Sequence, residues 1–202
     1  MFIKSQPLSG EKRKNIMNKH SNKFNSHFLF STVLGLGKTN KYFSTLAASI
    51  LAFPLTLFIM WASRKLADVI IEDAIYSLYA LVGLIFTIIT AFAIHSSGVY
   101  SKQIKIKDPG EVVIDEVLGQ TLCLILTWPL TFALLMSGKI SYTLAAFILP
   151  IILFRLFDSV KPWPIKAIER LKGGFGIVLD DLAAGFLAAL IYYAIVFSTT
   201  ML

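Results

Sequence analysis

Apolar residues in this chain gather into five long blocks that are separated by short polar connections. The blocks cover residues 43–61, 75–95, 117–136, 142–157 and 182–202. Most are close to the ~20 residues that a helix needs to cross a hydrocarbon core about 30 Å thick. The fourth is shorter and ends at Arg155, so we expect it to span fully or to lie partly in the interface. The pattern predicts an all-α integral membrane protein, a bundle of about five transmembrane or partly re-entrant helices.

The composition indicates that lipid is the solvent for these blocks. Of 202 residues, 56% are hydrophobic and 15% are charged, whereas soluble domains carry about 25% charged residues. One small core could not bury this apolar excess, so we expect a single membrane-embedded domain over residues 28–202. Residues 1–27 are polar and basic, and we expect a disordered cytoplasmic extension there that can lie on anionic lipid.

The 19 Lys and Arg residues are distributed unevenly among the connections. Eight precede the first block, and the second and fourth connections hold three and five, whereas the first and third hold two and one. The positive-inside rule then predicts a cytoplasmic N-terminus, with the second and fourth connections on the cytoplasmic side. Topology and anionic lipid explain the net charge of +7, so we expect no nucleic-acid partner.

The second connection ends in an acidic motif, Lys107-Asp-Pro-Gly-Glu-Val-Val-Ile-Asp-Glu116, that runs into the third block. Asp108 and Glu111 have the spacing of a capping box around a proline, so Asp108 is predicted to be a structural cap of a helix that begins there. Glu111 and Asp115 would then share a helical face, where two like charges repel unless a cation lies between them. Capping leaves Asp115 and Glu116 unexplained, because carboxylates at a membrane boundary are costly.

A second motif, Arg155-Leu-Phe-Asp158, ends the fourth block, and Lys161-Pro-Trp-Pro164 follows it. The spacing of three allows a local ion pair between Arg155 and Asp158. It equally allows Asp158 to bind a metal while Arg155 donates two parallel hydrogen bonds to phosphate oxygens. The two prolines cannot continue a helix, so they predict a rigid turn that presents Lys161 at the interface.

A third motif, Gly173-Gly-Phe-Gly176, precedes Asp180 and Asp181 at the start of the last block. A glycine loop lets backbone amides approach an anion closely, so Gly173 and Gly174 are candidate phosphate ligands. One aspartate in a first helical turn is favoured by the helix dipole alone. Two in succession at a lipid boundary indicate a functional role.

The predicted topology places all these motifs on the cytoplasmic side, where they could form one site. Hard carboxylate oxygens suit Mg²⁺, which is usually held together with waters and phosphate oxygens. The set therefore fits metal-assisted phosphoryl chemistry on a lipid phosphate, with Arg155 and Lys161 binding the phosphate oxygens. Either a carboxylate or a metal-bound water could attack phosphorus. The alternatives are a cation-coupled transporter, which would place acids near mid-span, and a non-catalytic membrane scaffold.

These motifs resemble those of the phosphatidylglycerophosphatase A family of bacterial inner-membrane lipid phosphatases. The matching strings cover residues 108–119, 154–165 and 173–185, whereas residues 35–48 lack the proline-containing stretch usual in that family. The resemblance implies Mg²⁺-dependent hydrolysis of phosphatidylglycerophosphate to phosphatidylglycerol and phosphate at the cytoplasmic face of the inner membrane. It also implies metal ligands at Glu111, Asp115, Glu116, Asp158, Asp180 and Asp181. The catalytic residues would be Asp115, Glu116, Asp158 and Asp181.

Overall fold

The computed structural model describes residues 26–70 and 75–200, so nearly all of the predicted N-terminal extension lies outside the described residues. The described segments form helices, with no strand among them, and the all-α prediction is confirmed. In chain order the elements are α2 (Ser26–Ser31), the 3-10 helix η1 (Leu36–Lys38), α3 (Lys41–Ile70), α4 (Ile75–Ile104), α5 (Ile114–Met136), α6 (Ile140–Val160), α7 (Ile165–Ile168) and α8 (Gly174–Thr200).

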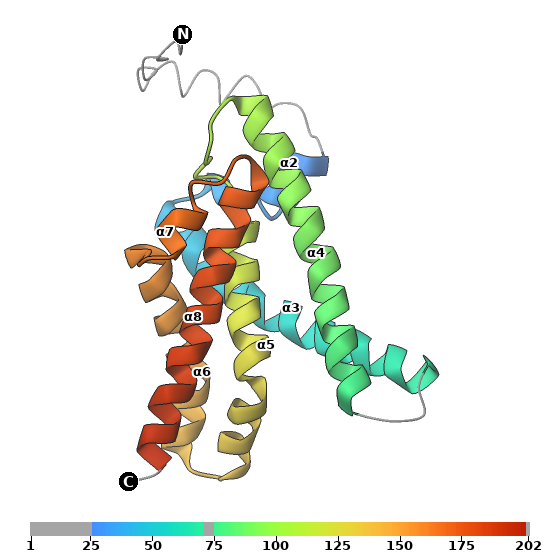
Figure 1. The fold of residues 1–202 in the computed structure, drawn as a ribbon, viewed down its shortest axis with the longest axis vertical. Coiled ribbons are helices and arrows are strands. Elements are labelled where there is room, and N and C mark those ends of the chain that lie inside the picture. The colour runs from blue at the N-terminus through green and yellow to red at the C-terminus, as the bar shows by residue number, and fades with distance from the viewer. Residues whose placement is uncertain (1–25, 71–74, 201–202) are drawn as a thin grey trace.

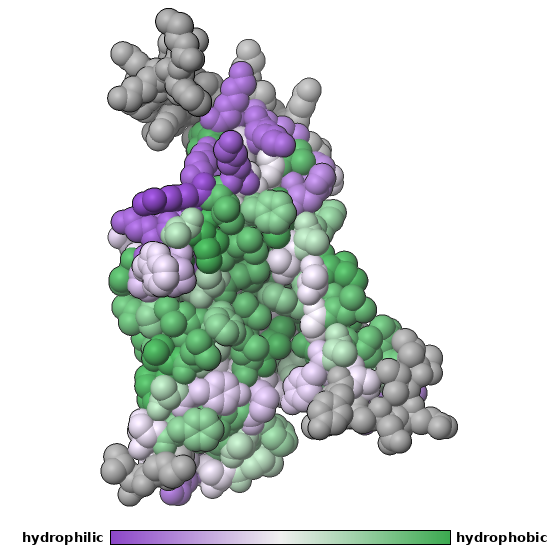
Figure 2. Space-filling model, in the orientation of Figure 1, coloured by the Kyte–Doolittle hydropathy of each residue, from purple (hydrophilic) through white to green (hydrophobic). Residues whose placement is uncertain are grey.

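Four helices in the described ranges are long and apolar enough to cross a membrane. They cover Lys41–Asp68, Ser77–Ile104, Ile114–Met136 and Gly174–Thr199. They contain the first and third predicted blocks, the second block from residue 77 and the fifth up to residue 199. The fourth block forms α6, which is not among these four. Figure 2 shows a broad hydrophobic band across the visible face of the helices, with hydrophilic residues gathered at the end that carries α7 in Figure 1. These features confirm an all-α membrane protein.

Helix α5 is the central element of the bundle. It packs against α3, α6 and α8, while α4 packs against α3 and α8. Figure 1 shows α5, α6 and α8 running side by side, whereas α4 diverges from them along its length. The helices that begin at the α7 end are α3, α5 and α8, and α6 ends there. Residues at the starts of three helices and the end of a fourth are therefore brought together.

Glycines allow α5 and α8 to approach each other closely. A methyl group at Gly185 of α8 would overlap the carbonyl oxygen of Gly119 on α5. A methyl group at Gly119 would in turn lie 2.6 Å from the carbonyl oxygen of Asp181 and 2.6 Å from the Phe154 ring. Small residues at helix crossings permit such approach in membrane proteins. Because this crossing lies about one turn from Glu116 and from Asp181, it places the acidic segments of both helices together.

Helix α8 begins at Gly174, so Gly174 and Gly176 lie in its first turn and not in a loop. A methyl group at Gly174 would overlap the carbonyl oxygen of Ile94, which shows that this glycine permits close packing of α8 on α4. The predicted glycine loop is therefore wrong for Gly174 and Gly176, while Gly173 lies in the turn that precedes the helix. Asp180 and Asp181 consequently lie in the second turn of α8, beyond the N-terminal position that was expected for them.

Helix α5 begins at Ile114, later than the capping-box pattern predicts. The Val112 amide donates to the Pro109 carbonyl at 2.9 Å, which closes a turn ahead of the helix. Val113 occupies the N-cap position, and no side chain caps the helix there. The predicted role of Asp108 as a structural cap is therefore wrong, because the segment that follows it forms a turn.

Candidate active site

A cleft of about 810 Å³ opens where α3, α5 and α8 begin and α6 ends. Six acidic and three basic side chains line it, so the cleft is formally negative. The acids are Asp108, Asp115, Glu116, Asp158, Asp180 and Asp181, and the bases are Lys41, Arg155 and Lys161. The structure thus brings together five of the six predicted metal-ligand positions, which come from three motifs spread over more than 60 residues of the chain.

Three of these acids are buried. Asp115, Asp180 and Asp181 are 9%, 3% and 4% exposed. An isolated buried carboxylate is costly unless a donor or cation compensates it. The cleft therefore concentrates negative charge at a depth where water alone cannot screen it well.

Lys161 supplies one compensating charge. It ends α6 in the left-handed conformation with φ 44°, as part of the turn that the two prolines predict. Its Nζ donates to Asp180 Oδ2 at 2.5 Å. Burial lowers the pKa of Lys161, but the hydrogen bond and charge of Asp180, with the charges of Asp181 and Asp158, raise it more. The pKa therefore lies above its ordinary value, and the ammonium group stays charged at neutral pH.

The two acidic pairs at the α5 and α8 ends have similar local geometry. Asp115 Oδ1 accepts a hydrogen bond from the Glu116 amide at 2.9 Å, and Asp180 Oδ1 accepts one from the Asp181 amide at 3.0 Å. Within residues 26–70 and 75–200, no donor pairs with the Asp181 carboxylate. Asp181 therefore has oxygens available to a proton, a cation or a water molecule in the cleft.

Arg155 holds three helices together at one wall of the cleft. Its Nε donates to Ser49 Oγ at 3.0 Å and its Nη2 to the Thr45 carbonyl at 2.6 Å, both on α3. Its Nη1 donates to Glu116 Oε2 at 2.9 Å, and the ion pair with Asp158 is longer, at 3.7 Å. Arginine has five N–H donors. Because most of them are committed to α3 and α5, the guanidinium fixes the wall and has little capacity left for phosphate.

Glu111 is the one predicted metal ligand that does not line the cleft. Its Oε2 accepts a hydrogen bond of 2.5 Å from the Tyr100 hydroxyl on α4. Because α5 begins only at Ile114, Glu111 and Asp115 do not share a helical face as predicted.

The two glycines predicted to bind phosphate also lie outside the cleft lining. Gly174 packs on the α4 backbone. Gly173, with φ 67°, borders a separate cavity of about 70 Å³ that it shares with Lys107, Asp108 and Glu169. Asp108 lines both this cavity and the acidic cleft.

The start of α3 contributes cleft residues that sequence reasoning did not assign. They are Lys41, Tyr42, Ser44 and Thr45. Polar residues that lead into an apolar helix are typical of any membrane boundary, so their types carried no specific information. The tertiary hydrogen bonds of Thr45, which accepts from Arg155 at its carbonyl and donates to Glu116 from its hydroxyl, show that this end of α3 belongs to the site.

The oxygen ligands that the cleft offers are of the kind that suits Mg²⁺. The cleft offers hard carboxylate oxygens, an excess of negative charge and buried acids that a cation would compensate. Among the described residues, no three acidic, His or Cys side chains form a ready ligand group. Mg²⁺ usually takes one or two carboxylates and completes its shell with waters and substrate phosphate oxygens. The residues therefore fit an ion that the substrate helps to hold.

Comparison with known proteins identifies the family. The family model described as Phosphatidylglycerophosphatase A matches residues 29–196. The chain belongs to the phosphatidylglycerophosphatase A family. This confirms the resemblance drawn from the three motifs, and the match covers every residue that lines the cleft.

Curated relatives match over shorter stretches. The phosphatidylglycerophosphatase A of Escherichia coli K12 is 32% identical over 121 residues, which cover 59% of this chain and 62% of that protein. The phosphatidylglycerophosphatase A of Haemophilus influenzae Rd is 37% identical over 91 residues, covering 45% of this chain and 48% of that protein. A Bacteroides thetaiotaomicron protein named as a candidate phosphatidylinositol-3-phosphatase is 38% identical over 80 residues, covering 39% and 43%. The chain thus spans less than two thirds of the length of each of these relatives, and no solved structure matches it.

Proposed function

We propose that this protein hydrolyses the phosphomonoester of phosphatidylglycerophosphate with Mg²⁺, giving phosphatidylglycerol and inorganic phosphate at the cytoplasmic face of a bacterial inner membrane. The observation that carries the proposal is the convergence of six carboxylates and Lys161 in one cleft at the polar end of an apolar helix bundle. Membership of the phosphatidylglycerophosphatase A family supports the substrate.

The reaction breaks the bond between phosphorus and the glycerol oxygen and forms one between phosphorus and a water oxygen. Asp115, Asp158, Asp180 and Asp181 are the residues that would hold Mg²⁺, which when bound neutralises charge on the phosphate. The Lys161 ammonium lies beside these acids and would attract the same phosphate oxygens. The Asp181 carboxylate, which accepts no hydrogen bond in the described part of the chain, would also accept the proton that the attacking water loses and return it to the glycerol oxygen as that oxygen leaves.

Glu116 and Arg155 have a different part in this proposal. Their ion pair of 2.9 Å joins α5 to α6, and Arg155 extends the connection to α3. We assign Arg155 to positioning, because it holds the cleft wall through Glu116 and α3. A rigid wall keeps the acids at a fixed separation, which catalysis by positioned groups requires.

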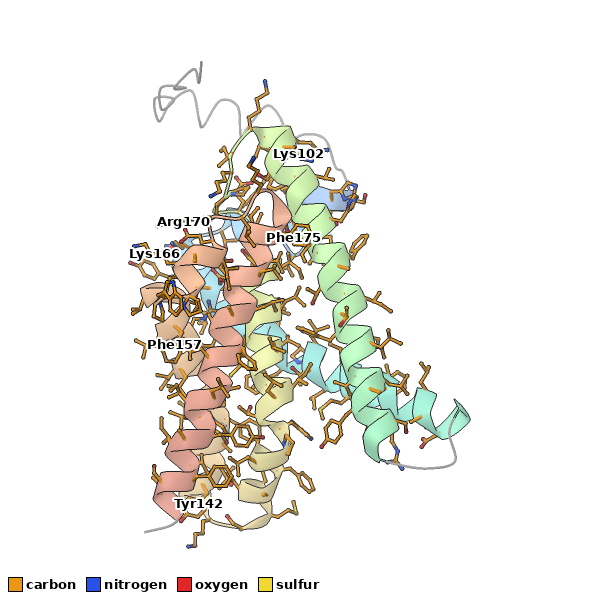
Figure 3. The ribbon with its side chains drawn as sticks, viewed as in Figure 1. Lys102, Tyr142, Phe157, Lys166, Arg170 and Phe175 are labelled. Atoms are coloured by element: carbon orange, nitrogen blue, oxygen red, sulfur yellow. The ribbon has the colours of Figure 1, made fainter. Side chains whose placement is uncertain are left out.

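The distribution of basic residues supports the cytoplasmic orientation. Figure 3 labels Lys102, Lys166 and Arg170 at the end that carries the cleft, and Tyr142 at the opposite end. Lys41 and Lys161 line the cleft itself. Because Lys and Arg concentrate on the cytoplasmic side of membrane proteins, the cleft would face the cytoplasm.

The position of the acids favours an enzyme over a cation-coupled transporter. Transporter ion sites lie near the bilayer midplane at breaks in helices. Here Asp115 and Glu116 lie in the first turn of α5, and Asp180 and Asp181 lie in the second turn of α8. All four are therefore at one end of their spans.

Phosphate release from a defined lipid tests the proposal. Purified protein in detergent would be given phosphatidylglycerophosphate with Mg²⁺, then with a chelator, then with Mg²⁺ restored. We expect release that chelation abolishes and Mg²⁺ restores. Phosphatidylinositol 3-phosphate in a parallel reaction measures head-group preference, and we expect slower release from it. No release from phosphatidylglycerophosphate, or release that is indifferent to chelation, would overturn the proposal.

A further inference from the structure

A second cavity, of about 160 Å³, lies between α3, α5 and α6. Its two hydroxyl groups are already occupied, because Thr56 donates to the Ala52 carbonyl at 2.7 Å and Thr131 lies 3.3 Å from the Tyr192 hydroxyl. A cavity without free polar groups does not hold ordered water. The rest of its wall is apolar and includes Phe53, Leu57, Leu124, Trp128, Ala146 and Phe147.

This cavity is aligned with the acidic cleft along the same three helices. Arg155 and its partners Thr45 and Glu116, here called the Arg155 clamp, each lie eight positions from a cavity residue on the same helix. Eight residues correspond to about 12 Å along a helix. The pairs are Thr45 and Phe53 on α3, Glu116 and Leu124 on α5, and Arg155 and Phe147 on α6. The cavity therefore lies about 12 Å further along each helix from the Arg155 contacts, a distance of about two fifths of the thickness of a bilayer core.

We propose that this cavity receives an acyl chain of the lipid whose phosphate group occupies the cleft, an inference that rests on the proposed function. A lipid with its head group in the cleft must direct its chains toward the hydrocarbon core, which is the direction in which the cavity lies. Apolar cavities of about 150 Å³ bind small hydrocarbons such as benzene. A helix about 10 Å in diameter could not enter this space, so an acyl chain is the occupant that fits.

The cavity also has an opening toward lipid. Leu57 lines it and is 53% exposed, while Phe53 and Phe147 lie with ring centroids 6.0 Å apart across the α3–α6 boundary. A chain could thus enter sideways from the membrane while the head group enters the cleft. Arg155, which bridges the same two helices through Ser49, would lie at the boundary between head group and chain.

One buried polar group lies between the cleft and the cavity. Gln120 is four residues beyond Glu116 and four before Leu124, so the three share one face of α5. Its side-chain nitrogen and oxygen are buried and have no hydrogen-bond partner among the described residues. Gln120 lines neither the cleft nor the cavity, so a glycerol hydroxyl or ester group of a bound lipid would become its partner only if the side chain turned toward the lipid.

A substitution that fills the cavity tests the proposal by kinetics. Leu57→Trp adds bulk to the wall, and Leu84→Trp is its matched control, because Leu84 lies on α4 outside the cavity lining and is 55% exposed. Each variant would hydrolyse long-chain phosphatidylglycerophosphate and a dihexanoyl analogue. We expect Leu57→Trp to lower kcat/KM about tenfold for the long-chain lipid only, which equals the lost burial of about two methylene groups. An unchanged ratio between the two substrates would overturn the proposal.

A binding measurement that needs no turnover separates this inference from the proposed function. Trp61→Phe and Trp163→Phe leave Trp128, in the cavity wall, as the sole tryptophan. We expect saturable quenching of its fluorescence by brominated-chain phosphatidylglycerophosphate without Mg²⁺, reversed by the unbrominated lipid and not by inorganic phosphate. Hydrolysis without saturable quenching would overturn the acyl-chain site alone. Quenching without phosphate release would retain the lipid site and overturn the proposed function.

Discussion

Gly119→Ala tests whether the close approach of α5 and α8 builds the site. The added methyl carbon would lie 2.6 Å from the Asp181 carbonyl oxygen, whereas ordinary contacts begin at 3.4 Å. The two groups must therefore separate by 0.8 Å, and the movement acts directly on the backbone of a cleft residue. Overpacking of this kind costs about 1–3 kcal/mol. A displacement near 1 Å can lower the rate of a positioned reaction by about 100-fold.

The matched control for this substitution is Gly83→Ala on α4, where no neighbouring atom lies within 4 Å of the added methyl group. Removing a glycine from an exposed helix position should leave stability unchanged or raise it by up to about 1 kcal/mol. Thermal unfolding in detergent and phosphate release would be measured for both variants. We expect Gly119→Ala to unfold several degrees lower, at about 2–4 °C per kcal/mol, and to lose most of its turnover. Equal behaviour of the two variants would refute the reasoning.

Two further predictions concern residues whose positions the structure clarifies. In Arg155→Lys, a single ammonium group cannot bond Glu116 and α3 together. We therefore expect the free energy of unfolding to fall by about 2 kcal/mol or more and kcat to fall as well. Wild-type values of both quantities would contradict the assigned role of Arg155. In Glu111→Gln, the amide oxygen can still accept the Tyr100 hydrogen bond, so we expect most of the turnover to remain in a phosphate-release assay. A loss as large as that of Asp181→Asn would instead show that Glu111 reaches the reaction.

The sequence predicts the membrane helices well, because lipid exposure makes each span apolar over most of its length. The ends of the helices are predicted less well. A helix can begin well before the apolar block that predicts it, as α8 does by starting at Gly174, eight residues ahead of the block that begins at residue 182. The capping-box pattern predicts a start of α5 that is too early. The segment before Val113 forms a turn, and the Val113 amide donates to the Ser31 carbonyl at 3.0 Å, a contact between distant parts of the chain.

The acidic residues that line the cleft can also be predicted from the sequence, because charged side chains at a membrane boundary are energetically costly and therefore rare without a role. Lys161 is readable for the same reason, aided by its proline turn. The packing role of Gly174 is not predictable from the sequence, because a glycine that binds an anion and a glycine that lets two helices approach look identical there. The partners of Arg155 were not readable, since Ser49 and Thr45 are common residues in any span.

The most direct test of the central claim is the turnover of Asp181→Asn on phosphatidylglycerophosphate, measured beside Asp68→Asn. Asp68 lies on α3 in an exposed pair with Arg64 at 3.1 Å, far from the cleft lining. If the buried carboxylates carry the reaction, Asp181→Asn lowers kcat by about 10²–10⁴-fold while its thermal midpoint stays at or above that of the wild type, and Asp68→Asn remains unchanged. Near-normal turnover in a folded Asp181→Asn protein would contradict the account.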